Sequence, residues 1–176
     1  MAISMCLLAV SMAHPVWGSA QTQSEFRVKA AYVFNLTKYV EWPSEKESLT
    51  IGVIGEGPIV QTLNSELSGR ISDSRLIKVL INPPDDQIRR CDMLFIAFKS
   101  GRQIEQLLRR VSGYPLLTVS DTASFARQGG VVGLITVGDR IEIQINLEAS
   151  RRANLKISSR LLNLATLVEP AREGGR

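Results

Sequence analysis

The run DMLFIAF, Asp92 to Phe98, decides the fold class of this chain. Every residue after Asp92 in this run is apolar, which does not suit a strand that has one face in water. A strand buried on both faces needs a layer of other elements on each side of its sheet. The sequence therefore predicts an α/β fold, a three-layer sandwich in which helices cover both faces of a β-sheet.

Segments on both sides of this run alternate between strands and helices. Short apolar runs predict strands at 49–55, 75–82 and 115–121, and apolar residues three or four apart predict helices at 58–67 and 102–111. This alternation favours parallel β-α-β units. The runs VVGLITV and RIEIQINL, joined by Gly138-Asp139, instead predict an antiparallel hairpin. We therefore expect a single domain with a mixed sheet.

The segment KAAYVFNLTKYVEWP, Lys29 to Pro43, belongs to a predicted amphipathic helix. Ser24 is a good N-cap, and Pro43 is expected to end the helix because the residue before a proline disfavours the α region. Glu25 and Lys29 have the spacing of a supporting i,i+4 ion pair. The face expected to pack on the sheet carries Phe26, Ala30, Val33, Phe34 and Thr37.

The last apolar segment predicts a second long helix, with a break near Asn154 as an open alternative. Its regular stripe consists of Ile157, Leu161, Leu164, Ala165 and Val168. Further leucines lie off this stripe, beside basic residues: Leu155, Leu162 and Leu167, with Arg151, Arg152, Lys156 and Arg160. A wide apolar arc with basic edges is typical of a helix that docks on a partner, and equally of a helix wedged between two layers. Both interpretations stay open.

The first twenty residues predict export. An apolar run from Ala2 to Ala13, the helix-breaking Pro15 and the small residues Gly18-Ser19-Ala20 are typical of a secretory signal peptide that is cleaved after Ala20. The run is too short to span a bilayer, which takes about 20 apolar residues. Residues 1–20 are therefore interpreted as a signal peptide and residues 21–176 as one α/β domain.

The composition excludes several kinds of site. The single histidine, His14, would leave with the signal peptide, which removes Ser-His-Asp and Cys-His nucleophiles and histidine-bound zinc. Cys6 would leave too, so Cys91 has no disulfide partner and is expected to be a buried strand cysteine. The formal net charge of +4 comes from scattered basic pairs, which makes nucleic acid a poor partner. An acidic protein face or an anionic membrane surface fits this pattern better.

Two further kinds of site have simpler interpretations. Gly55-Glu56-Gly57 stands where a dinucleotide-binding fingerprint would, but Val60 occupies the place of the third glycine, so an ordinary turn fits better. Carboxylates at Asp85-Asp86, Asp121 and Glu142 could serve a hydrolase, yet nothing in the sequence brings two of them together. No cofactor, metal or catalytic residue is predicted.

Two passages near the ends of the chain resemble one known family. EFRVKAAYVFNLTKYVEWP, Glu25 to Pro43, resembles the entry motif of the YfiR/HmsC family, in which a K-A-A-aromatic-x-x-N helix ends in an aromatic-x-E-W-P corner. RIEIQINLEASRRANLKISSRLLNLATLV, Arg140 to Val168, is similar to that family's closing motif. Each motif alone is weak evidence, but together they bracket almost the whole predicted domain.

The resemblance implies a periplasmic regulator that is not an enzyme. Family members repress an inner-membrane diguanylate cyclase by binding its periplasmic domain, and an outer-membrane lipoprotein can sequester them. Cyclic-di-GMP signalling, exopolysaccharide and biofilm are the downstream readouts, and members form dimers. This chain departs from the best-known member, which has disulfides, because Cys91 is unpaired. We therefore expect a membrane cyclase or another membrane sensor as partner.

The residues expected to form a partner or ligand surface come from both motifs. Lys38 and Tyr39 lie on the outer side of the first helix, while Trp42-Pro43 is expected to fix the turn into the next strand. The basic side of the last helix adds Arg151, Arg152, Lys156 and Arg160. In an alternative hypothesis the protein senses or binds a small periplasmic ligand, and Asn146, Arg151 and Arg152 donate hydrogen bonds to an anion.

Overall fold

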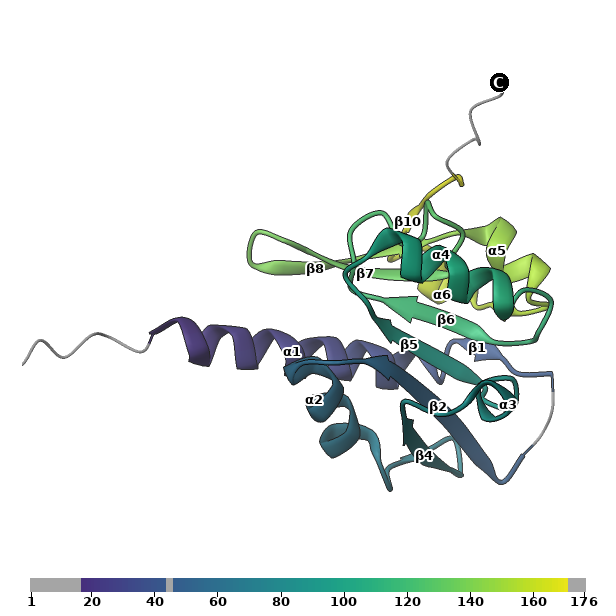
Figure 1. Cartoon of the computed structure of the whole chain (residues 1–176), viewed down its shortest axis with the longest axis horizontal. Helices are drawn as coiled ribbons and strands as arrows, with labels where there is room; N and C mark the ends of the chain where they lie inside the picture. Colours follow the sequence, from purple (N-terminus) through teal and green to yellow (C-terminus); the bar gives the residue numbers. More distant parts are fainter. Residues whose placement is uncertain (1–16, 44–45, 171–176) are drawn as a thin grey trace, which may run out of the picture.

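The computed structural model describes residues 17–43 and 46–170, and a mixed sheet forms its centre (Figure 1). In spatial order its eight strands are β10 (Thr166–Leu167), β8 (Arg140–Ile145), β7 (Val132–Val137), β6 (Leu117–Ser120), β5 (Met93–Ala97), β2 (Ser48–Gly55), β4 (Arg75–Ile81) and β3 (Ile71–Ser72). The strands from β7 to β4 are parallel, whereas β8 and β3 run antiparallel to their neighbours β7 and β4. The predicted mixed sheet is confirmed.

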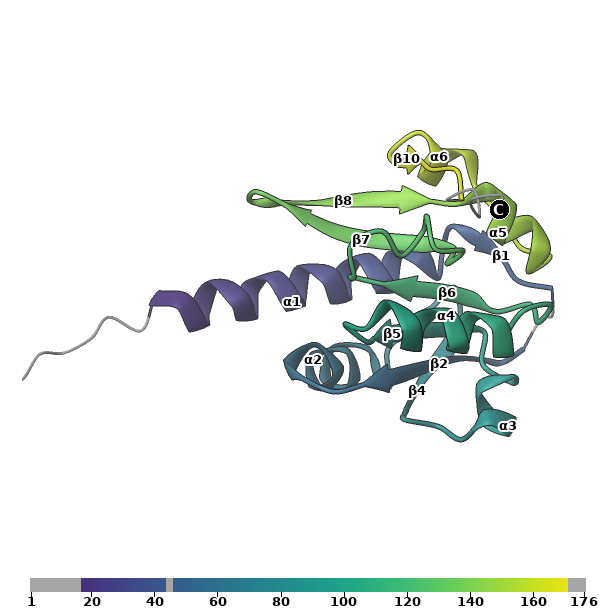
Figure 2. The same cartoon turned by 45° about the horizontal axis from the view of Figure 1, so that its top comes forward.

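Helices cover both faces of the sheet, as the apolar β5 requires. The main core cluster lies under α1 (Trp17–Leu36) and α2 (Pro58–Leu67), and a second cluster lies under α4 (Gly101–Arg110) and the short α3 (Asp85–Ile88) (Figure 2). In β5, Met93 and Phe95 belong to the first cluster, and Leu94 and Ile96 to the second. All four are fully buried, and burial of each such side chain contributes about 1.5–3 kcal/mol. The predicted three-layer sandwich is confirmed.

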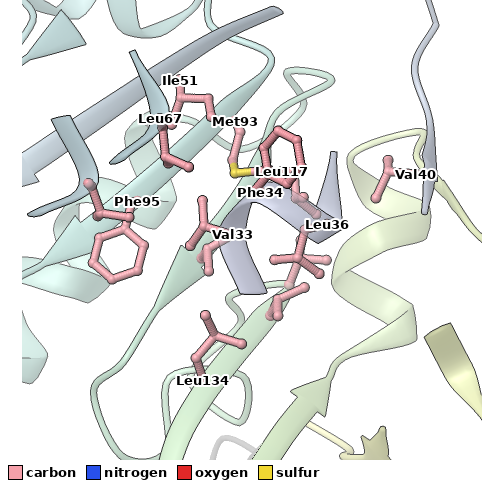
Figure 3. Close-up of a cluster of buried hydrophobic side chains, with 14 of the residues drawn as sticks. Val33, Phe34, Leu36, Val40, Ile51, Leu67, Met93, Phe95, Leu117 and Leu134 are labelled. Carbon is pink, nitrogen blue, oxygen red and sulfur yellow. The ribbon is translucent and has the colours of Figure 1, made fainter. Parts of the chain in front are cut away.

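The apolar stripe of α1 packs on the central strands. Figure 3 shows Val33 and Leu36 of this helix in one cluster with Leu117 of β6 and Leu134 of β7. The predicted core face agrees with the structure: Ala30, Val33, Phe34 and Thr37 are buried, and Phe26 is half-buried. For the strands and helices predicted between residues 49 and 147, the predicted first and last residues differ from the observed ones by at most two positions.

Helix α1 differs from the prediction at both ends. It begins at Trp17 instead of Ser24, so it passes through Ala20, and it ends at Leu36 instead of Pro43. The early end has a local cause, because the Thr37 hydroxyl donates to the carbonyl oxygen of Phe34 at 2.6 Å and the chain then turns into β1 (Val40–Glu41). The predicted signal-peptide run, residues 2–13, lies outside the described residues.

The predicted continuous C-terminal helix is wrong, and the alternative of a break near Asn154 is confirmed. In its place the chain forms α5 (Leu147–Arg152), β9 (Lys156–Ile157), α6 (Ser159–Leu162) and β10. Asn154 adopts a left-handed backbone with a φ of 52°, which prevents α5 from continuing. The N–H groups of Ser158 and Val168 then donate to carbonyl oxygens of Tyr39 and Ile145, at 2.8 and 2.9 Å. These bonds hold the segment as separate short elements.

The apolar spacing that predicted this helix comes from residues with different roles. Leu161 and Val168 are buried, whereas Leu164 is 73% exposed. A continuous helix would have placed all three on one face. The docking-helix and wedged-helix interpretations therefore both fail, although basic and exposed apolar residues remain in this segment.

Candidate functional site

A two-stranded ladder brings the two end motifs together. β1 pairs antiparallel with β9, with Val40 opposite Ile157, and the N–H of Ser158 donates to the carbonyl oxygen of Tyr39 at 2.8 Å. The end of the first motif therefore lies beside the middle of the second. We call the polar side chains gathered around this ladder the corner surface; they are Lys38, Tyr39, Glu41, Lys156 and Arg160.

Hydrogen bonds from Thr37 and Trp42 hold the turn beneath the corner surface. The indole Nε1 of Trp42 donates to the carbonyl oxygen of Thr37 at 3.0 Å. The Thr37 hydroxyl oxygen lies 2.7 Å from that of Ser72, and both residues are buried. The predicted structural role of Trp42 in this turn is confirmed, and the indole is half-buried against the core.

Lys38 and Tyr39 are adjacent in sequence but have different surroundings. Lys38 is exposed, and its Nζ lies 4.8 Å from the centroid of the Phe34 ring. The guanidinium of Arg70 lies 3.7 Å from the same centroid, so two cations gather around one ring. Each cation–π contact contributes about 0.5–1 kcal/mol at an exposed site. Tyr39 is half-buried and packs against the main core, so Lys38 is the more accessible of the two residues.

The C-terminal segment contributes basic residues to the corner surface, and exposed apolar residues follow them in the sequence. Lys156 Nζ lies 3.5 Å from Glu41 Oε2, and at 82% and 73% exposure this pair contributes about 0–1 kcal/mol. Arg160 is exposed and forms no salt bridge within the described residues. Leu164 and Leu167 follow it with 73% and 53% of their surface exposed. Exposed leucines beside basic residues are typical of a surface that contacts another protein.

The structure corrects the assignment of Asn146 to an anion site. Its side-chain Nδ2 donates to the carbonyl oxygen of Ala126 at 2.7 Å, and its Oδ1 accepts from the N–H of Ala149 at 2.9 Å. Asn146 has no exposed surface. It is the N-cap of α5, and its amide is used entirely inside the protein.

The two arginines of α5 have different environments. Arg151 is exposed and forms no salt bridge within the described chain. Arg152 pairs with Glu148 one turn earlier and lines a groove of about 810 Å³ between α4 and α5. No residue of the corner surface lines this groove. Of the predicted surface residues, Arg152 therefore lines the groove, Arg151 belongs to neither the groove nor the corner surface, and Asn146 is buried.

A buried lysine links α1 to the sheet, and the sequence did not predict this contact. Lys29 Nζ lies 2.6 Å from Glu25 Oε1 and 2.8 Å from Asp121 Oδ2, just beyond the end of β6. The hydroxyl of Thr136 on β7 donates to the same Glu25 oxygen at 2.6 Å. Only the Glu25–Lys29 pair was visible in the sequence, because its two members lie on one helix.

These contacts shift the pKa values of the network. Burial lowers the pKa of Lys29, but its hydrogen bonds to Asp121 and Glu25 outweigh this effect and leave the pKa above its ordinary value. The hydrogen bond from Lys29, followed by that from Thr136, holds the pKa of Glu25 below its ordinary value. Both groups are therefore charged at neutral pH, which is the state of a structural ion pair.

Three of the carboxylates considered for a hydrolase have separate partners. Asp85 contacts Arg110 at 3.2 Å on the surface, and Glu142 accepts a hydrogen bond from the Gln144 amide at 3.2 Å. Asp121 is held by Lys29. Within the described residues there is no group of three or more His, Cys, Asp or Glu side chains that could hold a metal ion.

Cys91 lies two residues before β5 and is buried, and its thiol donates to the carbonyl oxygen of Gln87 at 3.4 Å. Burial, followed by the negative charge of Asp92, raises the pKa of Cys91 to about 11. A pKa two units above the ordinary value leaves about a hundredfold less thiolate at pH 8.

We expect iodoacetamide to label Cys91 at least tenfold more slowly in the native protein than in urea, measured by peptide mapping. Equal rates would contradict the buried thiol.

The fold and the corner surface define a single-domain α/β protein whose two end motifs meet at one place. The sequence model of the YfiR/HmsC-like family matches residues 26–166, and the chain belongs to this family. This is a family of periplasmic regulatory proteins. No helix among the described residues is long and apolar enough to cross a membrane.

A solved structure has a similar fold. It is the crystal structure of a conserved domain protein from Vibrio cholerae O1 biovar eltor, with a TM-score of 0.55 and 11% sequence identity. The match covers 81% of this chain and 59% of that chain. At this identity the likeness concerns the fold alone, and the chain spans little more than half of that protein.

Proposed function

We propose that this protein is a periplasmic inhibitor that binds the periplasmic domain of an inner-membrane diguanylate cyclase and represses cyclic-di-GMP signalling. Export through the signal peptide at residues 1–20 is part of the proposal. Membership of a family of periplasmic regulators supports it. The observation that carries it is the β1–β9 ladder, which joins the two family motifs at the corner surface.

Inhibition of this kind needs a surface and no catalytic group. A protein that binds the inactive state of the cyclase more tightly than the active state shifts the population toward the inactive state by its difference in affinity. Lys38, Arg70 and Arg160 make the corner surface and its surroundings basic, which favours an acidic face on the partner. A lipoprotein that sequesters the inhibitor at the outer membrane, and a homodimer, are further proposals taken from the family.

The corner surface can be tested by reversing two exposed charges. We expect the double variant Lys38→Glu, Arg160→Glu to lose repression, because like charges placed against an acidic partner cost several kcal/mol. Cyclic-di-GMP, measured by mass spectrometry in cell extracts, should rise to the level of a strain that lacks the gene. Tyr39 is left unchanged because truncating a half-buried residue would also disturb the core.

The matched control is Arg140→Glu, at the exposed start of β8 away from β1 and β9. It should repress normally, and all variants should reach the same periplasmic level on immunoblots. Normal repression by the double variant would refute the assignment of the corner surface. Unchanged cyclic-di-GMP after deletion of the gene would refute the function itself.

A further inference from the structure

The groove between α4 and α5 collects arginines from three distant segments. Arg109 lies in the last turn of α4, Arg127 in the loop that follows β6, and Arg152 in the last turn of α5. The volume of about 810 Å³ falls within the range of about 300–1,000 Å³ that is usual for small-molecule sites. The fold, and not a local sequence motif, brings these three side chains to one place.

The charges in the groove do not cancel. Arg109 pairs with Glu105 and Arg152 with Glu148, each one turn earlier on its own helix. Arg127 forms no salt bridge within the described residues. Glu105 is the only acidic residue among the described residues that line the groove, and Glu148 pairs with Arg152 from just outside it, so three arginines against two glutamates leave a formal excess of one positive charge (3 − 2).

Helix stabilisation accounts for only part of this arrangement. Basic residues at the C-terminal end of a helix interact favourably with its dipole, which explains Arg109 and Arg152. Arg127 is exposed, is not on a helix, and forms no ion pair with a carboxylate of the described residues. Its exposed guanidinium at the groove is therefore available to a bound anion.

The rest of the lining suits a small organic molecule. Gly129 has a left-handed backbone with a φ of 101°, and a Cβ placed there would lie 4.0 Å from Nη2 of Arg152, so the guanidinium runs beside the loop backbone. Ser112, Gln128 and Tyr114 add neutral polar groups, and further lining residues are apolar: Leu108, Val111 and Leu116. Apolar walls with a few convergent polar groups are typical of ligand sites.

We propose that this groove binds a small organic dianion, whose phosphate or carboxylate oxygens are held by Arg127 together with Arg109 and Arg152. Guanidinium groups bind both kinds of oxyanion through pairs of parallel hydrogen bonds. The two existing ion pairs are exposed and weak, so each arginine can turn from its glutamate to the ligand at little cost. The site is separate from the corner surface and does not depend on the proposed cyclase.

Calorimetry on the purified protein tests the site with four defined probes: glycerol 2-phosphate, malonate, succinate and acetate. We expect at least one of the first three to bind with a dissociation constant below about 1 mM in low salt and at least tenfold tighter than acetate. The phosphate and dicarboxylate arms distinguish the two sources of the oxyanion. Raising the salt from 20 to 200 mM should weaken binding, because the groove is open to solvent.

Two arginine variants locate the binding. Arg127→Ala should weaken the best probe by about tenfold or more, since a hydrogen bond to a charged group is lost. Arg140→Ala removes the same charge outside the groove and should bind as the wild type does. Equal melting temperatures will show that both variants are folded. Absence of binding by all three probes, or equal loss in the two variants, would overturn the proposal.

Discussion

Replacing Lys29 by methionine is expected to destabilise the protein by about 3 kcal/mol. The lysine side chain is only 5% exposed and holds Glu25 and Asp121 at 2.6 and 2.8 Å. Methionine would fill much of its space but would leave two carboxylates without their cation. Removing one partner of a buried pair costs about 3–5 kcal/mol, and the lower end applies because the carboxylates are 34% and 21% exposed. The melting temperature should fall by about 6–12 °C in a calorimetric scan.

Arg27→Ala on the same helix is the matched control. Arg27 also pairs with a glutamate, Glu66 at 3.2 Å, but it is 66% exposed. Exposed pairs contribute about 0–1 kcal/mol, so this variant should melt close to the wild type. If both variants lost the same stability, Lys29 would not be the anchor of α1 that its contacts indicate.

The Lys29 effect should also depend on pH. The pKa of Glu25 is lowered by folding, so its stabilisation is present above its ordinary pKa of 4.5 and is lost as the pH falls through the lower folded value. The pKa of Lys29 is raised, so its stabilisation is present below its ordinary value of 10.5 and is lost as the pH rises through the higher folded value. The difference between wild type and Lys29→Met should therefore be largest between these limits and shrink in acid.

Gly130→Ala is the second substitution with a large expected effect. A Cβ at Gly130 would lie 2.1 Å from the Cε1 atom of Phe125, far inside van der Waals contact. The Phe125 ring has no exposed surface and is packed in the second core cluster, so it cannot move aside cheaply. Overpacking of this kind costs about 1–3 kcal/mol and occasionally more. We expect about 3 kcal/mol, measured by urea unfolding.

Two further variants make this test specific: a control substitution at another glycine, Gly101, and a smaller side chain at Phe125. Gly101→Ala should be nearly neutral, because its nearest neighbour would lie at an ordinary 3.7 Å from the added Cβ. In a Phe125→Leu background, Gly130→Ala should cost less than it does alone, since the ring it meets has been removed. An equal cost in both backgrounds would show that the clash is not with Phe125.

The regular elements could be predicted from the sequence because their signals are local. The apolar run at 93–97 marks a strand buried on both faces, and Pro58 marks the first residue of α2. The core face of α1 follows from side chains that lie three and four residues apart. The two end motifs identified the family before any contact between them was visible.

The two-residue strands and the sites they create could not be predicted in this way. The alternation of apolar and polar residues that indicates a strand needs about four residues to be recognised. The two-residue strands β1 and β9 are too short to show it. The C-terminal segment has helical spacing, but hydrogen bonds to Tyr39 and Ile145 divide it into short elements. Asn146 carries the same side chain whether it caps a helix or binds an anion, and only its neighbours decide which.

The sequence by itself determined the order of the longer strands and helices between residues 49 and 147, the burial of the central strand, the core face of α1 and the membership of a family of periplasmic regulators. The tertiary structure alone decided that Lys29 meets Asp121, 92 positions away, that the two motifs share one corner, and that three arginines line one groove. The physical reason is the distance along the sequence over which each effect acts. Periodicity and turn chemistry act over a few residues, whereas these contacts exist only once the sheet has fixed the order of its strands.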